Sequence, residues 1–107
     1  MGTKGDKHSS QAQLAVELFS ERLSEISGII SKKMFGAYGI LHEGKMFGLI
    51  NSKGEVYLKA DETIRHKFDK AGAHSHGKMP YFSLPDFVFT DPEKLLTWVR
   101  DSIGVSK

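Results

Sequence analysis

The chain has 107 residues, a formal net charge of +2 and no cysteine. The length fits one globular domain, and a hydrophobic content of 39% is enough to bury a core. The lack of cysteine excludes a disulfide framework, a thiolate zinc site and a cysteine nucleophile. No apolar run approaches the ~20 residues that span a bilayer, and the N-terminus has no apolar signal-peptide region, so we expect a cytoplasmic protein outside the membrane.

An amphipathic helix is predicted over residues 11–27, ended by Gly28. Ser10 and Gln13 fit a capping box, in which each side chain bonds a free backbone N–H at the helix start. The positions that recur at three- and four-residue spacing are Leu14, Ala15, Leu18, Phe19, Arg22, Leu23 and Ile26. A single apolar stripe of this kind indicates that the helix packs against a sheet.

The tetrapeptide Lys-Met-Phe-Gly occurs twice, at Lys33–Gly36 and Lys45–Gly48. The surrounding block predicts a three-stranded meander with strands at Met34–His42, Met46–Ile50 and Glu55–Lys59, joined by glycine-containing turns. Each copy places a lysine at the entrance of a strand and Met and Phe on opposite faces. We therefore interpret the repeat as two similar strand starts and not as an active site.

The third predicted strand alternates between two faces. Val56 and Leu58 point one way, whereas Glu55, Tyr57 and Lys59 point the other. Such alternation is typical of an antiparallel sheet with one buried face and one wetter face.

The second half of the chain predicts two helices separated by extended segments. Asp61 is a good N-cap for a helix over residues 62–71. Residues 73–85 contain two prolines and predict two short extended segments. The run Asp91-Pro92-Glu93 combines a cap, a proline at the first helical position and an acid in the first turn, so a last helix should begin there and end at Gly104.

These elements give the order α-β-β-β-α-β-β-α. We predict the α+β class, as a two-layer α/β fold with an antiparallel sheet and helices packed on one face. Residues 1–9 are polar and are expected to form a flexible N-terminal tail, which leaves residues 10–107 as one domain.

Several motifs, in this order and spacing, resemble the N-terminal domain of the TfoX family, also called Sxy, which is named for bacterial competence regulators. They are Lys33-Met34-Phe35-Gly36, Tyr38-Gly39-Ile40, Gly44-Lys45-Met46-Phe47, Val56-Tyr57-Leu58-Lys59 with Asp61, His76-Gly77-Lys78-Met79-Pro80-Tyr81-Phe82, Leu84-Pro85, and Asp91-Pro92-Glu93 with Leu95-Leu96 and Trp98. The resemblance covers residues 11–104 and implies an α/β two-layer fold.

The resemblance also implies a role in transcriptional regulation, since full-length members promote expression of DNA-uptake genes together with the cyclic-AMP receptor protein. It brings no catalytic residues with it. Full-length members continue into a second, helical domain, whereas this sequence stops at Lys107, so we expect a stand-alone single-domain member.

The sequence shows no recognisable catalytic or cofactor-binding constellation. His74 and His76 would project to the same side of an extended segment, but zinc needs three or four ligands, and no cysteine or nearby acidic cluster completes the set. The glycines of the meander do not open a helix, so they do not form a phosphate loop. We expect no enzyme activity, no cofactor and no metal.

The outer face of the sheet is the candidate interaction surface. It would include Lys33, Tyr38, Lys45, Tyr57 and Lys59. Lysines beside aromatic rings can bind nucleic acid, whereas exposed aromatic side chains on a sheet more often mark a protein interface, so we favour a protein partner. Direct nucleic-acid binding and a small-ligand site stay open as alternatives. An exposed sheet edge also allows a homodimer, although Pro80 and Pro85 blunt one edge.

Overall fold

The computed structural model describes the backbone of residues 4–34 and 36–106, and the side chains of residues 11–34 and 36–106. Within this part of the chain, five strands form one antiparallel sheet in the order β1-β2-β3-β4-β5. The strands are β1 Ile29–Met34, β2 Ala37–His42, β3 Lys45–Ile50, β4 Val56–Lys59 and β5 Tyr81–Ser83. The helices are α1 Lys4–Arg22, α2 Arg65–Lys70, α3 Asp86–Phe89 and α4 Pro92–Ser106.

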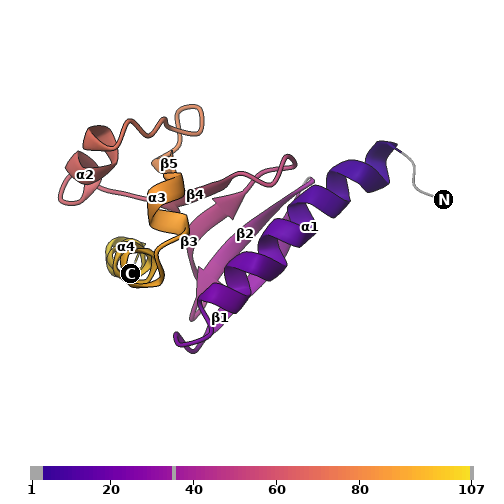
Figure 1. Ribbon diagram of the computed structural model, residues 1–107, viewed down its shortest axis with the longest axis horizontal. Helices are drawn as coiled ribbons and strands as arrows, with labels where there is room; N and C mark the ends of the chain where they lie inside the picture. The colour runs from indigo at the N-terminus through magenta and orange to yellow at the C-terminus, as the bar shows by residue number, and fades with distance from the viewer. Residues whose placement is uncertain (1–3, 35, 107) are drawn as a thin grey trace.

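The helices lie on one side of the sheet, with α1 crossing it and α3 and α4 beside one another (Figure 1). This arrangement confirms the predicted α+β class and the two-layer architecture. Among the described helices, none combines the length and the apolar composition that a membrane span requires.

The meander contains one strand more than expected. A turn that includes Gly36, with φ at +80°, divides the expected first strand Met34–His42. The additional strand, β1, precedes this turn in the sequence and pairs antiparallel with β2, which follows the turn. β1 is an edge strand in which the side chains between Ile29 and Met34 are exposed. The alternation that reveals a half-buried strand is therefore missing from its sequence.

α1 begins and ends at other residues than predicted, whereas α4 begins at Pro92 as predicted and differs only at its end. α1 begins at Lys4 and ends at Arg22, so Ser10 lies inside the helix and does not cap it. Residues 4–9 of the expected tail are thus helical, residues 1–3 fall outside the described residues, and the domain start at residue 10 stays a prediction. α4 continues through Gly104 to Ser106, because the packing of Ile103 offsets the modest cost of an exposed helical glycine.

Of the two predicted aspartate caps, Asp91 caps its helix, whereas Asp61 does not cap α2, whose N-cap is Ile64. Asp91 accepts hydrogen bonds at Oδ1 from the backbone N–H groups of Glu93 and Lys94, at 3.0 and 3.2 Å. Asp61 accepts one from Thr63 at 2.9 Å, but the turn that it caps precedes α2 and the helix itself is shorter than predicted. Of the two extended segments expected in residues 73–85, one is β5 and the other is a single bridge between Ser75 and Phe82.

The main core lies between the sheet and the helices. Its largest fully buried side chains are Phe19, Phe47, Phe68, Leu23, Ile40, Ile50, Leu58 and Leu95. A β-bulge places Phe47 in this core: Ile40 pairs with Gly48, but Leu41 pairs with Met46, so Phe47 is the extra residue on β3. Met46 consequently lies on the opposite face, as predicted for the second Lys-Met-Phe-Gly copy.

The face of the sheet opposite the helices, which we call the open face, carries a second and smaller cluster. Leu49, Tyr57 and Tyr81 are buried there, and Met34, Ala37 and Met46 pack against them. Val56 and Leu58 face the main core, so the predicted alternation of β4 is confirmed.

Candidate functional site

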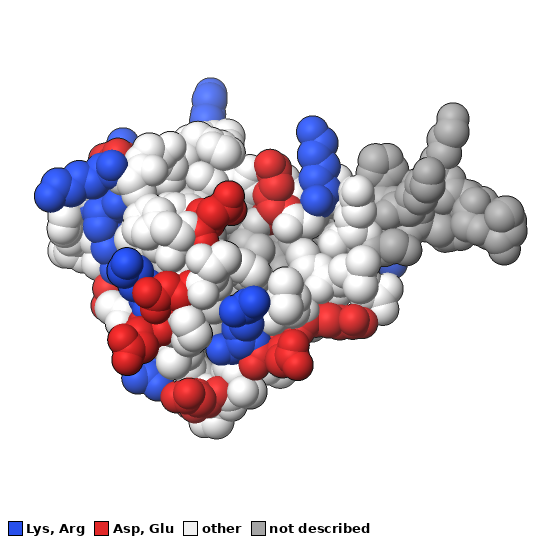
Figure 2. All heavy atoms as spheres, viewed as in Figure 1, with Lys and Arg blue, Asp and Glu red and all other residues white. Residues whose placement is uncertain are grey.

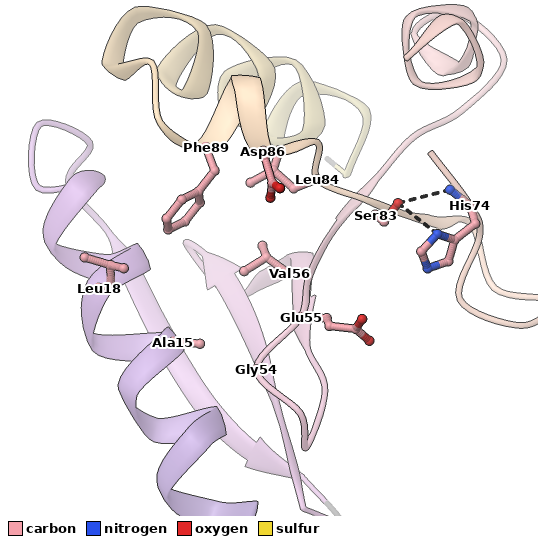
Figure 3. A pocket seen from close by; sticks show the side chains of 10 residues that line it. All are labelled: Ala15, Leu18, Gly54, Glu55, Val56, His74, Ser83, Leu84, Asp86 and Phe89. Atoms are coloured by element: carbon pink, nitrogen blue, oxygen red, sulfur yellow. Dashed lines mark hydrogen bonds between the residues drawn. The ribbon is translucent and has the colours of Figure 1, made fainter. Parts of the chain in front are cut away.

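A hollow in the described part of the molecule lies between α1 and α3, over the start of β4 and the end of β5. It encloses about 490 Å³. We call it the α1–α3 groove, and Figure 3 shows the ten residues that line it. They are Ala15, Leu18, Gly54, Glu55, Val56, His74, Ser83, Leu84, Asp86 and Phe89.

The turn between β3 and β4 forms one end of the groove. Asn51 accepts hydrogen bonds at Oδ1 from the backbone N–H groups of Lys53 and Glu55, at 3.0 and 2.9 Å. Gly54 has φ at +86°, and a Cβ atom there would lie 3.0 Å from the carbonyl oxygen of Gln11. Glycine is therefore needed twice over, for the backbone conformation and for the close approach of α1 to the turn.

The floor and walls of the groove are apolar. Val56, Leu84 and Phe89 are half-buried, and Leu18 is 41% exposed. Figure 3 shows Leu18 on α1 and Phe89 on α3 facing one another across the hollow. The guanidinium carbon of Arg22 lies 5.0 Å from the centroid of the Phe89 ring, so Arg22 makes a cation–π contact with this wall of the groove.

A chain of polar side chains borders the groove and continues onto the open face. Asn51 Nδ2 donates to Glu55 Oε1 at 2.7 Å, and the Tyr57 hydroxyl donates to the same oxygen at 3.4 Å. The Tyr57 hydroxyl also lies 3.3 Å from His74 Nε2, and His74 Nδ1 lies 3.3 Å from Ser83 Oγ.

Two members of this chain, Glu55 and Tyr57, have pKa values that differ from those of free side chains. The hydrogen bond from Asn51 holds the pKa of the Glu55 carboxyl below its ordinary value, with a smaller contribution from the charge of Lys53. Burial raises the pKa of the Tyr57 phenol, and the Glu55 carboxylate raises it further. At neutral pH the groove therefore has a carboxylate at this edge beside a neutral phenol.

The pair of Ser83 and His74 has a structural explanation. Ser83 Oγ also accepts a hydrogen bond from the backbone N–H of His74 at 3.0 Å, and the Ser83 N–H donates to the His74 carbonyl at 2.8 Å. These bonds hold the segment before β5 against the strand. The hydroxyl and the imidazole therefore act as a clamp on this connection.

Of the five residues predicted for the interaction surface, Tyr57 and Lys59 lie on the open face. Tyr57 is only 4% exposed. The rings of His74 and His76 cover it edge-on, with centroids at 5.8 and 4.9 Å. Its ring therefore offers no free surface on which a nucleic-acid base could stack.

The other three predicted residues do not join this surface. Lys33 pairs with Tyr38 in the β1–β2 register, and Tyr38 packs against the main core on the helix side. Lys45 borders a small hollow of about 230 Å³ with His42 and Ile103 at the end of α4. The five side chains are thus divided between the two faces of the sheet.

The two histidines considered for a metal site serve Tyr57 instead. His74 and His76 both point to its ring, as their shared side of the segment predicts. Within residues 11–34 and 36–106, no group of three or more His, Asp or Glu side chains is placed to hold a metal ion.

The groove itself was not predicted. The helical spacing places Leu14 and Leu18 on the inner face of the first helix, but in the structure they are 65% and 41% exposed. Ala12 and Val16 are buried in their place, beside Phe19 and Leu23. The sequence does carry a signal for this. The apolar side chains of both sets, the exposed leucines and the buried Ala12 and Val16, together cover a wider part of the helix circumference than one packed stripe needs.

The family model described as the TfoX N-terminal domain matches residues 21–106 of the chain. The search of curated proteins finds no match.

Proposed function

Because this chain belongs to the TfoX N-terminal domain family, which is linked in general to the regulation of competence for DNA uptake, we propose that it is a non-enzymatic regulatory domain that binds a protein partner. The partner that the family resemblance favours is a transcription factor of the cyclic-AMP receptor protein type. Such a role places the protein in the cytoplasm.

The observation that carries the proposal is the α1–α3 groove. It combines half-buried apolar walls with carboxylates and an imidazole at its edge. Protein interfaces use this combination, in which apolar side chains fill a hollow and a polar rim surrounds it. The backbone hydrogen bonds between Ser83 and His74 give their hydroxyl–imidazole pair a structural role, which supports a non-enzymatic function.

The distribution of lysines favours a protein partner over nucleic acid. Strand pairing puts Lys32 on β1 and Lys59 on β4 on the open face. Lys45 instead borders the small hollow beside α4. On the face that Figure 2 shows, the basic side chains gather mainly at the end of the molecule where α2 lies, and acidic side chains stand among them. Phosphate backbones bind where such cations are concentrated.

Binding measurements with purified components test this function. The full chain is titrated into a labelled transcription factor of the cyclic-AMP receptor protein type, and separately into labelled double-stranded DNA, at about 20 mM and about 300 mM salt. We expect saturable binding to the protein and no binding to DNA at either salt concentration. DNA binding at the lower concentration, with no binding to the protein, would contradict the proposal.

A Lys32→Ala, Lys59→Ala double variant is the control for the DNA titration. If binding to DNA occurred and depended on these lysines, direct nucleic-acid recognition by the sheet face would replace the proposed function. The molar mass of the free chain, measured by light scattering, tests the predicted homodimer in the same samples.

A further inference from the structure

We propose that the α1–α3 groove takes an amphipathic helix of the partner, in which lysine or arginine side chains flank an apolar stripe. This inference rests on the proposed function, since it names the chemistry of the segment that binds. Its basis is the pattern of apolar and acidic side chains on both sides of the groove.

The α1 side of the groove presents apolar side chains to solvent. Leu14 and Leu18 are one helical turn apart and are 65% and 41% exposed. Residues four apart on a helix are neighbours on its surface, so the two leucines form one short apolar ridge along α1. The ridge continues inward through Ala15 to the apolar wall of Phe89.

Acidic side chains lie outside this ridge. Glu17 and Glu21 are exposed, and each is three residues beyond one of the leucines. By the helical period they therefore stand beside Leu14 and Leu18 on the surface of α1. The α1 side of the groove is therefore apolar next to the hollow and negatively charged farther from it.

The opposite side of the groove, formed by the β3–β4 turn and α3, also carries negative charge. Glu55 lies on the β3–β4 turn and Asp86 at the start of α3, and both line the groove with exposed side chains. Asp86 points toward the hollow in Figure 3. In Figure 2, which has the same view as Figure 1, acidic side chains stand along α1 and above the hollow between α1 and α3.

Among the side chains that the structure describes, two cations are close to the groove. Arg22 is placed over the ring of Phe89, and Lys53 acts on Glu55 from the turn. Four carboxylates against two cations leave the rim negative, whereas the whole chain has a formal charge of +2. The negative potential is thus a local property of this groove, and a basic segment complements it.

A helix suits the groove better than an extended segment. The two leucines repeat at the spacing of one helical turn, and an adjacent helix that lies along α1 can place its own side chains at three- and four-residue spacing between them. Recognition of an amphipathic helix by an apolar groove uses this geometry.

The probe is a synthetic peptide of about 18 residues with leucines on one helical face and lysines on the two flanks, a length at which such a helix forms readily on a surface. A second peptide has glutamate in place of every lysine. Both carry a fluorophore, and their anisotropy is measured with the full-length chain at low salt. We expect the lysine peptide to bind at least about tenfold more tightly than the glutamate peptide. Equal affinity for the two peptides would overturn the proposal.

Variants of the chain locate the binding surface. Leu18→Ala should weaken binding of the lysine peptide about tenfold, because it removes an exposed apolar anchor. The double variant Glu55→Gln, Asp86→Asn should weaken it about fivefold through loss of two exposed charges. The control Glu62→Gln, near α2, should leave it unchanged. Circular dichroism checks the fold, and unchanged affinity in folded Leu18→Ala protein would contradict a site in this groove.

Binding of the transcription factor and binding of the lysine peptide can be measured independently, so failure of the groove site and failure of the proposed function give different results. If the transcription factor binds equally well to the wild-type chain and to Leu18→Ala, the regulatory function stands and the groove is not its docking site. If the lysine peptide binds in the groove but the factor does not bind at all, the inferred segment stands and the assignment of that partner is wrong.

Discussion

Met34 and Met46, one from each copy of Lys-Met-Phe-Gly, meet over Gly39 on the open face of the sheet. A Cβ atom at Gly39 would lie 3.1 Å from Met34 Cε and 3.0 Å from Met46 Sδ. Gly39 is on β2, and the methionines are on the two strands that flank it. The repeated tetrapeptide thus supplies matching thioethers that fill the space above a glycine, which is a packing role.

Replacing Gly39 with alanine should be tolerated. The ends of methionine side chains are flexible, so they can swing away from the new methyl group. We expect a change of less than about 1 kcal/mol in the free energy of unfolding, measured by urea denaturation. The matched variant is Gly48→Ala, whose Cβ would lie 3.3 Å from the carbonyl oxygen of Tyr57, a backbone atom that cannot swing. It should cost about 1–3 kcal/mol, and equal effects would contradict this explanation.

The contact between α1 and the β3–β4 turn predicts a larger cost at Gly54. Gly54→Ala forces both a positive φ and a clash with the carbonyl oxygen of Gln11, and should destabilise the protein by about 2–4 kcal/mol. Gly44→Ala is the control, because Gly44 also has φ at +86° but has no atom within 4 Å of the new Cβ. Thermal unfolding of the two variants isolates the contribution of the α1 contact. A smaller loss for Gly54→Ala than for Gly44→Ala would be incompatible with it.

The buried hydroxyl of Ser102 is expected to contribute nothing to the free energy of unfolding. Its Oγ atom is buried and has no hydrogen-bond partner among the described residues. Ser102→Ala should therefore leave the free energy of unfolding unchanged or raise it by up to about 1 kcal/mol. Ser106→Ala serves for comparison, since Ser106 Oγ donates to the Ser102 carbonyl at 2.7 Å, and its loss should cost about 0.5–1.5 kcal/mol. Urea denaturation that showed Ser102→Ala to be the more harmful change would disprove this assignment.

Two buried tyrosines should make the free energy of unfolding fall at alkaline pH. Burial raises the pKa of Tyr57 and of Tyr81 above the ordinary value of 10.0. The folded state therefore holds these protons more tightly than the unfolded chain. The resulting stabilisation is complete below pH 10.0 and is lost as the pH rises through the folded pKa values.

Absorbance at ~295 nm follows ionisation of the phenols, and urea denaturation at about pH 8 and about pH 11 measures the loss of stability. We expect Tyr57→Phe and Tyr81→Phe each to reduce the difference between the two pH values. Ionisation of all tyrosines at the ordinary pKa in the folded protein would refute the burial of these two rings.

The faces of the strands could be predicted where the sequence alternates. Val56 and Leu58 lie in the core, and Tyr57 and Lys59 lie on the other face, as their period of two requires. The burial of Tyr57 could not be predicted, because His74 and His76, which cover its ring, are distant in the sequence. A period gives the face of a side chain and says nothing of what a distant loop places over it.

The groove could not be predicted for a related reason. Its walls come from α1, the β3–β4 turn, β5 and α3, and only the tertiary fold brings these segments together. The local error was at Leu14 and Leu18: spacing alone cannot choose the packed stripe when Ala12 and Val16 offer a second one. Both candidate stripes satisfy the helical period, and packing against the sheet selects between them.

The central claim is that this domain acts through a protein partner at the α1–α3 groove. The most direct measurement is a two-dimensional ¹⁵N–¹H NMR titration of the full chain with an unlabelled transcription factor of the cyclic-AMP receptor protein type, and in a parallel sample with double-stranded DNA. The account predicts that the protein shifts or broadens the amide signals of Leu18, Val56 and Phe89, and that DNA leaves the spectrum unchanged. Perturbation by DNA at Lys32 and Lys59, with the groove signals unaffected by the protein, would contradict it.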